Sequence, residues 1–535
     1  MKGKIDISPE QLKIVQGILK DHLPGGTLAW AFGSRVTWTA KPFSDLDIAL
    51  EGAAPLPSDV LIDLDEAFEA SDLPWKVDVI DLNAVSPEFR AIVERQRVPA
   101  DWEEINLSEV FIVSSGLSKP RSEFGSGFPF LTFKDVFYNT FIPSELGGLV
   151  ASTESERAKH SIQRGDVFLT RTSETFDELG MSCVALANIP HATFNGFTKR
   201  LRPKKPKKII PEYLGYYFKS PKFRSAVNAV STMSTRASLN NSMLAVLPLV
   251  LPPLFEQSNI AQVLKAFDDK IELNRRMNET LEAMARAVFR DWFVDFGPTR
   301  RKAAGITNPA AILGGLLPDP TKAADLAALF PDRFGAKDLP EGWEKRPLDK
   351  IADFLNGLAL QKYPAKPHED SLPVIKIAEL RNGVSAKSNR ASREVPEKYI
   401  LKDGDYIFSW SGSLMAKYWT EGEGALNQHL FKVTSKSHPM WVVSGWVEHH
   451  LAEFQRIAAA KAVTMGHIKR SHLSEAMCVL PHEKALELMG QVIEPLMALI
   501  IQNSLENQTL AATRDLLLPK LMSGDLRLTG TEGAA

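Results

Sequence analysis

Residues 255–296 read FEQSNIAQVLKAFDDKIELNRRMNETLEAMARAVFRDWFVDF, and this stretch decides the fold. Its seam side chains recur at alternating steps of four and three residues, which is the heptad pattern of a coiled coil. The pattern predicts a long helix that needs a helical partner along its seam. The seam residues are Ile260, Leu264, Phe267, Ile271, Asn274, Asn278, Leu281, Ala285, Val288 and Trp292.

The same spacing returns 229 positions downstream, with asparagines at the same two steps. We expect the two seams to pair antiparallel, which brings Asn274 near Asn507 and Asn278 near Asn503. A buried asparagine pair fixes the register of a coiled coil at a cost in stability. The alternative is two unrelated long helices, each packed on its own domain. The second seam is Met489, Ile493, Leu496, Ile500, Asn503, Asn507, Leu510, Arg514, Leu517 and Leu521.

Length and composition are typical of a soluble protein with several domains. A chain of 535 residues exceeds what one hydrophobic core serves, so three or more domains are expected. The net charge of −2 means that any nucleic-acid site must be a local patch. Cys183 and Cys478 are the two cysteines and lie far apart in the sequence, so a disulfide framework is not expected. This cysteine content is consistent with a protein of the reducing cytoplasm. The N-terminus lacks a signal-peptide core and prolines interrupt the most apolar run, so we expect no membrane span.

Residues 1–100 combine strand signals with carboxylates. An apolar strand at 28–32 runs into a Gly-Ser turn, a D-x-D motif follows in the next strand, and another aspartate lies in a third strand. Alternate strand residues face one side, and clustered carboxylates suit Mg²⁺ carrying a nucleoside triphosphate such as ATP. The Gly-Ser turn suits phosphate binding. The candidates are Asp45, Asp47 and Asp78 for metal binding and catalysis, and Gly33 and Ser34 for the nucleotide.

These motifs resemble the minimal nucleotidyltransferases of the polymerase-beta superfamily. The resemblance covers roughly residues 10–95 and implies a small α/β domain that transfers a nucleoside monophosphate. One departure concerns the phosphate loop, where the family usually has a second glycine and this chain has Trp38. A bulky side chain there could narrow the triphosphate site. The alternative is a degenerate domain that serves only for docking.

The chain also repeats outside the two helices. Trp102-Glu103 is echoed by Trp343-Glu344, and the run from Gly165 to Ser173 is echoed by the run from Gly404 to Gly412. Gly-Asp followed by an apolar run predicts a turn into a strand. We therefore expect two copies of a mixed, β-rich domain.

Polar and basic residues gather at matching places in the two copies. Lys and Arg neutralise phosphates, and Arg, Asn, Ser and Thr can also read base edges in the major groove. We expect residues 199–208 to form a basic loop; the alternative is a solvated loop held extended by prolines. The candidate DNA contacts are Thr170, Arg171, Thr172, Lys199, Arg200, Arg202, Arg236 and Asn240 in the first copy, and Ser409, Trp410, Ser411, Lys461, Thr464, His467, Lys469 and Arg470 in the second.

From about residue 102 onward the chain resembles the specificity subunit of type I restriction-modification systems, a class of phage-defence enzymes. The resemblance implies two target-recognition domains that each read half of a split site in double-stranded DNA. It also implies two conserved helices that space these domains and bind methyltransferase subunits, expected to be two, alongside restriction subunits. The motifs are Leu251-Pro252-Pro253-Leu254-x-Glu256-Gln257, Asp291-Trp292-Phe293-Val294-Asp295-Phe296-Gly297-Pro298, Asn427-Gln428-His429-Leu430-Phe431 and Leu516-Leu517-Leu518-Pro519-Lys520-Leu521-Met522-Ser523-Gly524.

The expected fold is α+β and multidomain. An α/β nucleotidyltransferase-like domain precedes two β-rich recognition domains, which are separated by two long antiparallel coiled-coil helices. The expected boundaries are 1–100 for the nucleotidyltransferase-like domain, 101–250 and 342–480 for the recognition domains, 251–298 and 481–535 for the helices with the C-terminal tail, and 299–341 for a linker.

The leading hypothesis is a cytoplasmic DNA-recognition subunit. The chain shows neither a methyltransferase tetrad nor a translocase phosphate loop, so S-adenosylmethionine and ATP would act only through partner subunits. We expect the helices to act as a ruler, in which seven residues more or fewer change the spacer between half-sites. One alternative is a nucleotidyltransferase that acts on a partner protein or nucleic acid and uses the recognition domains for targeting. Another is a scaffold that does not bind DNA.

Overall fold

A computed structural model describes residues 4–175, 178–233, 237–317, 319–335, 338–460 and 466–528. The chain divides into two compact units, which are described separately. One comprises Met1–Asp268 together with Ala512–Ala535, and the other comprises Asp269–Ala511. The structure is mixed α and β, with a nucleotidyltransferase-like region, β-rich domains and long helices, as the sequence predicts.

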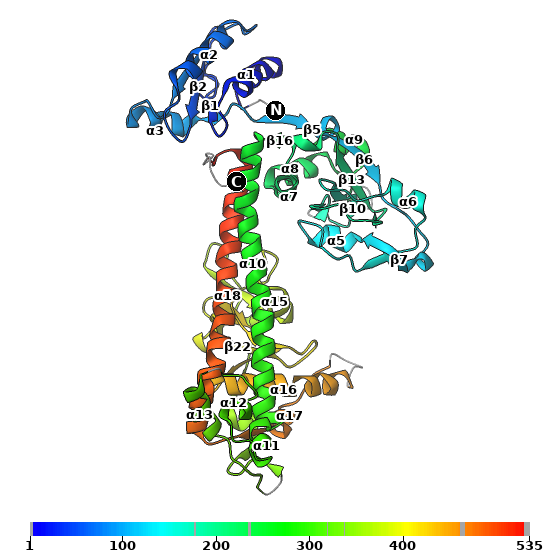
Figure 1. The fold of residues 1–535 in the computed structure, drawn as a ribbon, viewed down its shortest axis with the longest axis vertical. Helices are drawn as coiled ribbons and strands as arrows, with labels where there is room; N and C mark the ends of the chain where they lie inside the picture. Colours follow the sequence, from blue (N-terminus) through cyan, green and yellow to red (C-terminus); the bar gives the residue numbers. More distant parts are fainter. Residues whose placement is uncertain are drawn as a thin grey trace. The chain divides into compact units, whose positions relative to one another are not determined.

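In the first unit, the N-terminal region forms a four-stranded sheet with the order β3-β2-β1-β4. β2 runs parallel to β3 and antiparallel to β1. The helices cover the sheet through apolar residues such as Val15, Leu64 and Val93, which are fully buried. The elements are α1 (Pro9–His22), β1 (Leu28–Phe32), β2 (Leu46–Glu51), α2 (Ser58–Glu69), β3 (Val77–Asp81), α3 (Pro87–Gln96) and β4 (Val98–Pro99) (Figure 1).

The first β-rich domain holds a four-stranded sheet of order β11-β9-β13-β6 and two three-stranded sheets of orders β12-β7-β8 and β10-β15-β14. The last consists of β10 (Thr172–Ser173), β14 (Thr232–Met233) and β15 (Ala237–Ser238). A further two-stranded sheet joins β5 to β16, the last strand before the first long helix. The strands are β5 (Glu103–Asn106), β6 (Phe111–Ser115), β7 (Phe124–Leu131), β8 (Gly148–Val150), β9 (Val167–Thr170), β11 (Ser182–Val184), β12 (Thr193–Phe194), β13 (Thr198–Pro203) and β16 (Pro248–Leu251), and the main helices are α7 (Pro211–Tyr217), α8 (Pro221–Val230) and α9 (Asn241–Ala245).

In the second unit, the other β-rich domain repeats this topology. Its four-stranded sheet has the order β18-β25-β22-β23, which matches β6-β13-β9-β11 strand for strand, and β17 pairs with β26 as β5 does with β16. In the remaining sheet, β19 pairs in parallel with β24, as β7 does with β12. The elements are β17 (Glu344–Pro347), β18 (Asp353–Asn356), β19 (Ser371–Ile375), β20 (Arg390–Ser392), β21 (Ile400–Leu401), β22 (Tyr406–Ser409), β23 (Ala416–Tyr418), β24 (Gly424–Leu426), β25 (Leu430–Thr434), α16 (Met440–Ala459), α17 (Arg470–Glu475) and β26 (Met477–Leu480).

The repeated Gly-Asp motif has a structural role in both copies. Gly165 and Gly404 adopt φ values of +89° and +90°, a region in which a side chain is strained. The aspartate that follows each glycine accepts a main-chain hydrogen bond within the turn and forms an ion pair with the neighbouring strand. Asp166 pairs with Arg202 and Asp405 with Lys432, both at 2.6 Å. These contacts fix the point at which each central strand, β9 or β22, begins.

The two long helices are α10 (Leu254–Phe289) and α18 (Glu483–Ser523). In the second unit, Asn274 donates to Asn507 at 3.0 Å and Asn503 donates to Asn278 at 2.9 Å. In the first unit, Arg514 of α18 donates to Asp268 of α10 at 2.5 Å. Residue numbers rise along α10 as those of its partners fall, so the helices run antiparallel. α18 is also long and apolar enough to cross a membrane by length and composition alone, but several of its apolar side chains are buried inside the protein.

The described part of the segment between α10 and the second β-rich domain is largely helical. A π-helical turn at Arg290–Val294 leads into α11 (Gly297–Ala303), followed by α12 (Pro309–Ile312) and α13 (Pro320–Ala328). The apolar residues of this segment join the core of the second unit, where the Trp292 and Phe330 rings lie 5.6 Å apart. The segment expected as a linker is therefore packed against its own unit.

A buried ion network in the first unit joins the C-terminal tail to the N-terminal region. The side chain of Arg527 is fully buried and donates to Glu256 of α10, to Asp101 and to a main-chain oxygen of β1. Its guanidinium lies 4.8 Å from the centre of the Trp30 ring and 5.6 Å from that of Trp102. One side chain thus connects the nucleotidyltransferase-like sheet, the start of α10 and the residues after α18.

Candidate functional site

The carboxylates predicted for the N-terminal site lie at one end of the β1–β2–β3 sheet. Asp47 of β2 is the cross-strand neighbour of Asp78 of β3, and Phe32 pairs with Asp47 from the other side. Gly33 follows with φ +75°, and a β-carbon there would lie 2.2 Å from a carboxylate oxygen of Asp47. Only glycine fits this approach, so the Gly33 turn and the Asp47 carboxylate form one constellation. β2 begins at Leu46, so Asp45 precedes the strand instead of lying within it.

The charges of this constellation indicate what it can hold. Burial raises the pKa of Asp47, and the neighbouring charges of Asp78 and Asp45 raise it further. A cation would relieve this repulsion, and oxygen ligands suit Mg²⁺. However, Lys76 already pairs with Asp78 at 2.6 Å, and the described residues contain no group of three His, Cys, Asp or Glu side chains placed to hold a metal. The carboxylate oxygens therefore suit Mg²⁺, but the three side chains are not already placed to bind one ion together.

Arg35 holds the loop after Gly33, a function that the sequence motif did not reveal. Its buried guanidinium donates to the main-chain oxygens of Ser44 and Asp6 and lies 4.4 Å from the centre of the Trp75 ring. Trp38 follows in the same loop with φ +59°, which is strained for a side chain of this size. The residue that stands where the family usually has a glycine therefore also has a strained backbone conformation.

Three of the basic residues expected in a loop of the first β-rich domain, Lys199, Arg200 and Arg202, are strand residues, which corrects the prediction for them. Residues 198–203 form β13, the second inner strand of the sheet, because their main chain pairs with both β6 and β9. Lys199 donates to Ser115 and Asn241, Arg200 to the main-chain oxygen of Ser161, and Arg202 pairs with Asp166. All three charges therefore have partners within the protein.

Other candidates of the first domain also have structural roles. Thr170 is fully buried, and its hydroxyl accepts from the Met181 amide. Asn240 caps α9 by accepting from the Met243 amide. Thr172 lies in the short strand β10 (Thr172–Ser173), which pairs with β15 (Ala237–Ser238). Arg171, directly between Thr170 and β10, is half-buried, and Arg236 lies outside the described residues.

In the second domain the candidates converge on an aromatic cluster. The Trp410 indole donates to Asn356 at 2.9 Å, and its ring centre lies 5.9 Å from that of His429 and 6.4 Å from that of His467. His429, which belongs to the Asn427–Phe431 motif, is a member of this cluster that the sequence pattern did not indicate. Ser411 forms a hydrogen bond with His429, and Arg470 lies over the Phe431 ring. Ser409 is buried and bonded to the main chain of Ser413 and Met415, whereas Lys469 is exposed. Lys461 and Thr464 lie outside the described residues.

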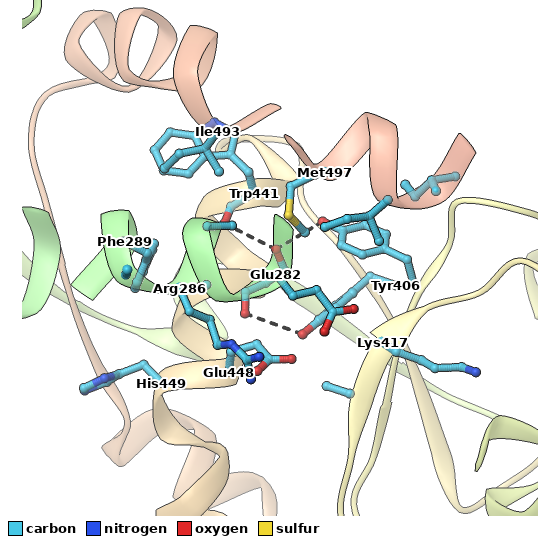
Figure 2. A pocket seen from close by; sticks show the side chains of 18 of the residues that line it. Glu282, Arg286, Phe289, Tyr406, Lys417, Trp441, Glu448, His449, Ile493 and Met497 are labelled. Carbon is cyan, nitrogen blue, oxygen red and sulfur yellow. Dashed lines mark hydrogen bonds between the residues drawn. The ribbon is translucent and has the colours of Figure 1, made fainter. Parts of the chain in front are cut away.

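A cavity of about 790 Å³ lies in the second unit, lined by α10, α16, α18 and the β22–β23 pair (Figure 2). Its wall is partly apolar, with Tyr406 and Trp441, and partly charged, with Glu282, Arg286 and Glu448. Burial raises the pKa of Glu448, and the nearby Arg286 charge opposes the shift. The cavity thus presents both long helices to a potential partner.

Comparison with known proteins matches both parts of the chain. The family described as type I restriction modification DNA specificity domain matches residues 99–283, and the polymerase beta nucleotidyltransferase family matches residues 15–98. The type I restriction enzyme MjaIX specificity subunit of Methanocaldococcus jannaschii is 26% identical over 450 residues, which cover 81% of this chain and 95% of the relative. The chain therefore combines a type I restriction modification DNA specificity domain with a nucleotidyltransferase domain, and its homologues are type I specificity subunits.

Two further relatives divide the chain in the same way. The HindI specificity subunit of Haemophilus influenzae is 22% identical over 480 residues, covering 80% of this chain and the whole relative. A protein of the same organism named "Probable protein adenylyltransferase MntA" is 46% identical over 93 residues, covering 17% of this chain and 81% of the relative. The chain therefore has a polymerase-beta-type nucleotidyltransferase domain over residues 15–98, and its homologues together with the specificity domain support DNA recognition as its function.

Proposed function

We propose that this specificity subunit reads a bipartite DNA site, with each β-rich domain contacting one half. The observation that supports this most directly is the strand-for-strand match of the two four-stranded sheets. Two domains of one topology with different side chains at matching positions suit two different half-sites. α10 and α18 connect them, and their asparagine pairs specify one alignment.

The test is footprinting of the chain in complex with its methyltransferase subunits on a DNA library. We expect two protected segments that are separated by an unprotected spacer of fixed length. A single continuous footprint, or protection that does not depend on sequence, would contradict the proposal.

The flanks of α10 and α18 would bind methyltransferase subunits, expected to be two, with restriction subunits joining the complex. The cavity of Figure 2 supports this assignment because it exposes an apolar wall with charged borders on both helices. S-adenosylmethionine and ATP would then act in those partners, in the cytoplasm. Pull-down of the methyltransferase subunit by the Arg286→Glu variant of α10 and the Met497→Lys variant of α18 tests the docking site, with the exposed Lys398→Glu change as control. Unchanged pull-down by both variants would contradict the assignment.

A second function is proposed for the N-terminal domain, namely transfer of AMP from ATP to a hydroxyl group of a partner protein or nucleic acid, with pyrophosphate released as the leaving group. Identity of 46% to the adenylyltransferase relative favours it, together with the approach of Gly33 to Asp47. Asp47 and Asp78, joined by Asp45, would hold Mg²⁺, which would supply charge neutralisation at the triphosphate. Gly33 and Ser34 would face the phosphates, and Lys76 would have to release Asp78.

Radiolabelled ATP with Mg²⁺ and the complete complex tests this activity. We expect a labelled partner with the wild-type chain and none with the Asp45→Ala plus Asp47→Ala variant. The Asp63→Ala change, an exposed acid on α2, is the matched control and should retain labelling. Absence of any labelled product with the wild type would favour a domain that serves only for docking.

A further inference from the structure

The two β-rich domains hold one backbone position in the same way. In each, the residue directly after the central strand, β9 or β22, donates its main-chain amide to the carbonyl of the residue just before the neighbouring strand, β13 or β25. Its own carbonyl accepts a hydrogen bond from a residue further along the chain. The residue directly after the central strand is Arg171 in the first domain and Trp410 in the second. The bonds are Arg171 to Phe197 at 3.0 Å, Leu239 to Arg171 at 2.9 Å, Trp410 to His429 at 3.4 Å and Ile468 to Trp410 at 3.0 Å.

A second pair of positions corresponds on the adjacent strand. Lys199 of β13 is the cross-strand neighbour of Ser115, and Phe431 of β25 is the cross-strand neighbour of Asn356. The two matching positions are therefore occupied by two cations, Arg171 and Lys199, in the first domain. In the second domain they are occupied by two aromatic residues, Trp410 and Phe431. The scaffolds are alike, but the chemistry they present differs.

One nitrogen of the Arg171 guanidinium lacks a hydrogen-bond partner in the described part of the chain. This nitrogen is the buried Nε, and the described residues provide no ion pair for the guanidinium. Lys199 beside it is held by Ser115 and Asn241, each at 2.9 Å. Burial lowers the pKa of Lys199, and the Arg171 charge lowers it further. This position thus combines positive charge with a donor that lacks an acceptor.

The corresponding place in the second domain is satisfied. The Trp410 indole already donates to Asn356, and its ring lies 6.0 Å from the Phe431 ring. Arg470 lies over Phe431 and donates to the main-chain oxygen of Phe354. Of these two matching positions, only that of the first domain therefore holds a cation with an unpartnered donor.

We propose that Arg171 reads a guanine in the half-site of the first domain; this inference rests on the proposed DNA-recognition function. The guanidinium is a planar fork that matches the O6 and N7 acceptors of guanine in the major groove. Main-chain bonds on both sides of Arg171 fix where that fork begins. A fork on a fixed backbone distinguishes bases, whereas a flexible surface lysine contacts phosphates without distinguishing them.

The test is genome-wide methylation mapping in cells that express the complete system with Arg171→Ala, Arg171→Lys or wild-type specificity subunit. We expect both variants to lose about ten- to a hundredfold discrimination for guanine at one position of one half-site. The other half-site and the spacer should stay unchanged. Lysine keeps the charge and the length but loses the fork, so Arg171→Lys separates base reading from charge. Arg121→Ala, an exposed arginine of the same domain, is the control.

Three results would overturn the proposal. One is a wild-type motif whose half-sites lack a G·C pair at any position that responds to Arg171. Another is uniformly reduced methylation with an unchanged motif, or an unchanged motif with Arg171→Lys, which would make Arg171 a phosphate contact. The last is an unaltered map with both variants. If the wild-type chain itself directs no motif-specific methylation, the proposed DNA recognition fails as well, so the two failures can be distinguished.

Discussion

At Arg527 a single buried cation neutralises two buried carboxylates, Glu256 and Asp101, and no other residue could replace its several donors. Removing one member of a buried ion network leaves an uncompensated charge. Arg527→Met should therefore lower the free energy of unfolding by about 3–5 kcal/mol, measured by urea denaturation followed by tryptophan fluorescence. Arg333→Ala removes only an exposed ion pair with Glu341 and should leave the free energy of unfolding nearly unchanged. Equal effects of the two changes would contradict the assigned role of Arg527.

The contact between Lys76 and Asp78 belongs to the same scale. Lys76 occupies one carboxylate of the proposed Mg²⁺ site, so Lys76→Ala should increase Mg²⁺ affinity severalfold in titration calorimetry. Lys20→Ala, an exposed lysine on α1 of the same domain, should leave the affinity unchanged. Weaker binding by Lys76→Ala would mean that Lys76 supports the site instead of competing with the metal.

At the scale of the helices, heptad spacing contained enough information to predict the pairing. Steps of four and three specify the seam, and the matched asparagines specify the register, because amides opposite leucine would lack partners. The structure places Asn503 against Asn278 at 2.9 Å, with the Asn278 amide also donating to Ser504. The DNA candidates were less predictable, since Lys199, Arg200 and Arg202 resemble a solvated loop until strand pairing buries them.

The asparagine pair also gives a prediction at this scale. Asn278→Leu alone should cost about 1–3 kcal/mol, because it leaves the buried Asn503 amide without its acceptor. The double change with Asn503→Leu should recover most of that loss, since two apolar side chains then face each other. A double-mutant cycle by urea unfolding measures the coupling. Additive losses would show that the two amides do not act as a pair.

At the scale of the whole molecule, the chain joins a repeated DNA reader to a nucleotidyltransferase domain that lies outside the repeat. Sequence repeats predicted the two β-rich domains, because motifs such as Gly165-Asp166 and Gly404-Asp405 recur at matching places. The clustering of Trp410 with His429 and the unpartnered Nε of Arg171 depend on tertiary packing, which a single sequence does not reveal.

The ruler hypothesis also belongs to this scale. Deleting seven residues from either long helix removes about 10 Å of helix and should change the spacer of the recognised motif without changing either half-site. The control is a variant in which seven exposed residues of the same helix are substituted without changing its length, and it should keep the spacer. An unchanged spacer would refute the ruler.

The most direct measurement of the central claim is methylation mapping of the host genome with this specificity subunit present and with it removed. We predict one bipartite motif, with two half-sites and a fixed spacer, whose methylation disappears completely when the subunit is absent. Methylation that persists without the subunit, or that follows a single continuous motif, would contradict the claim that its two β-rich domains select the DNA site.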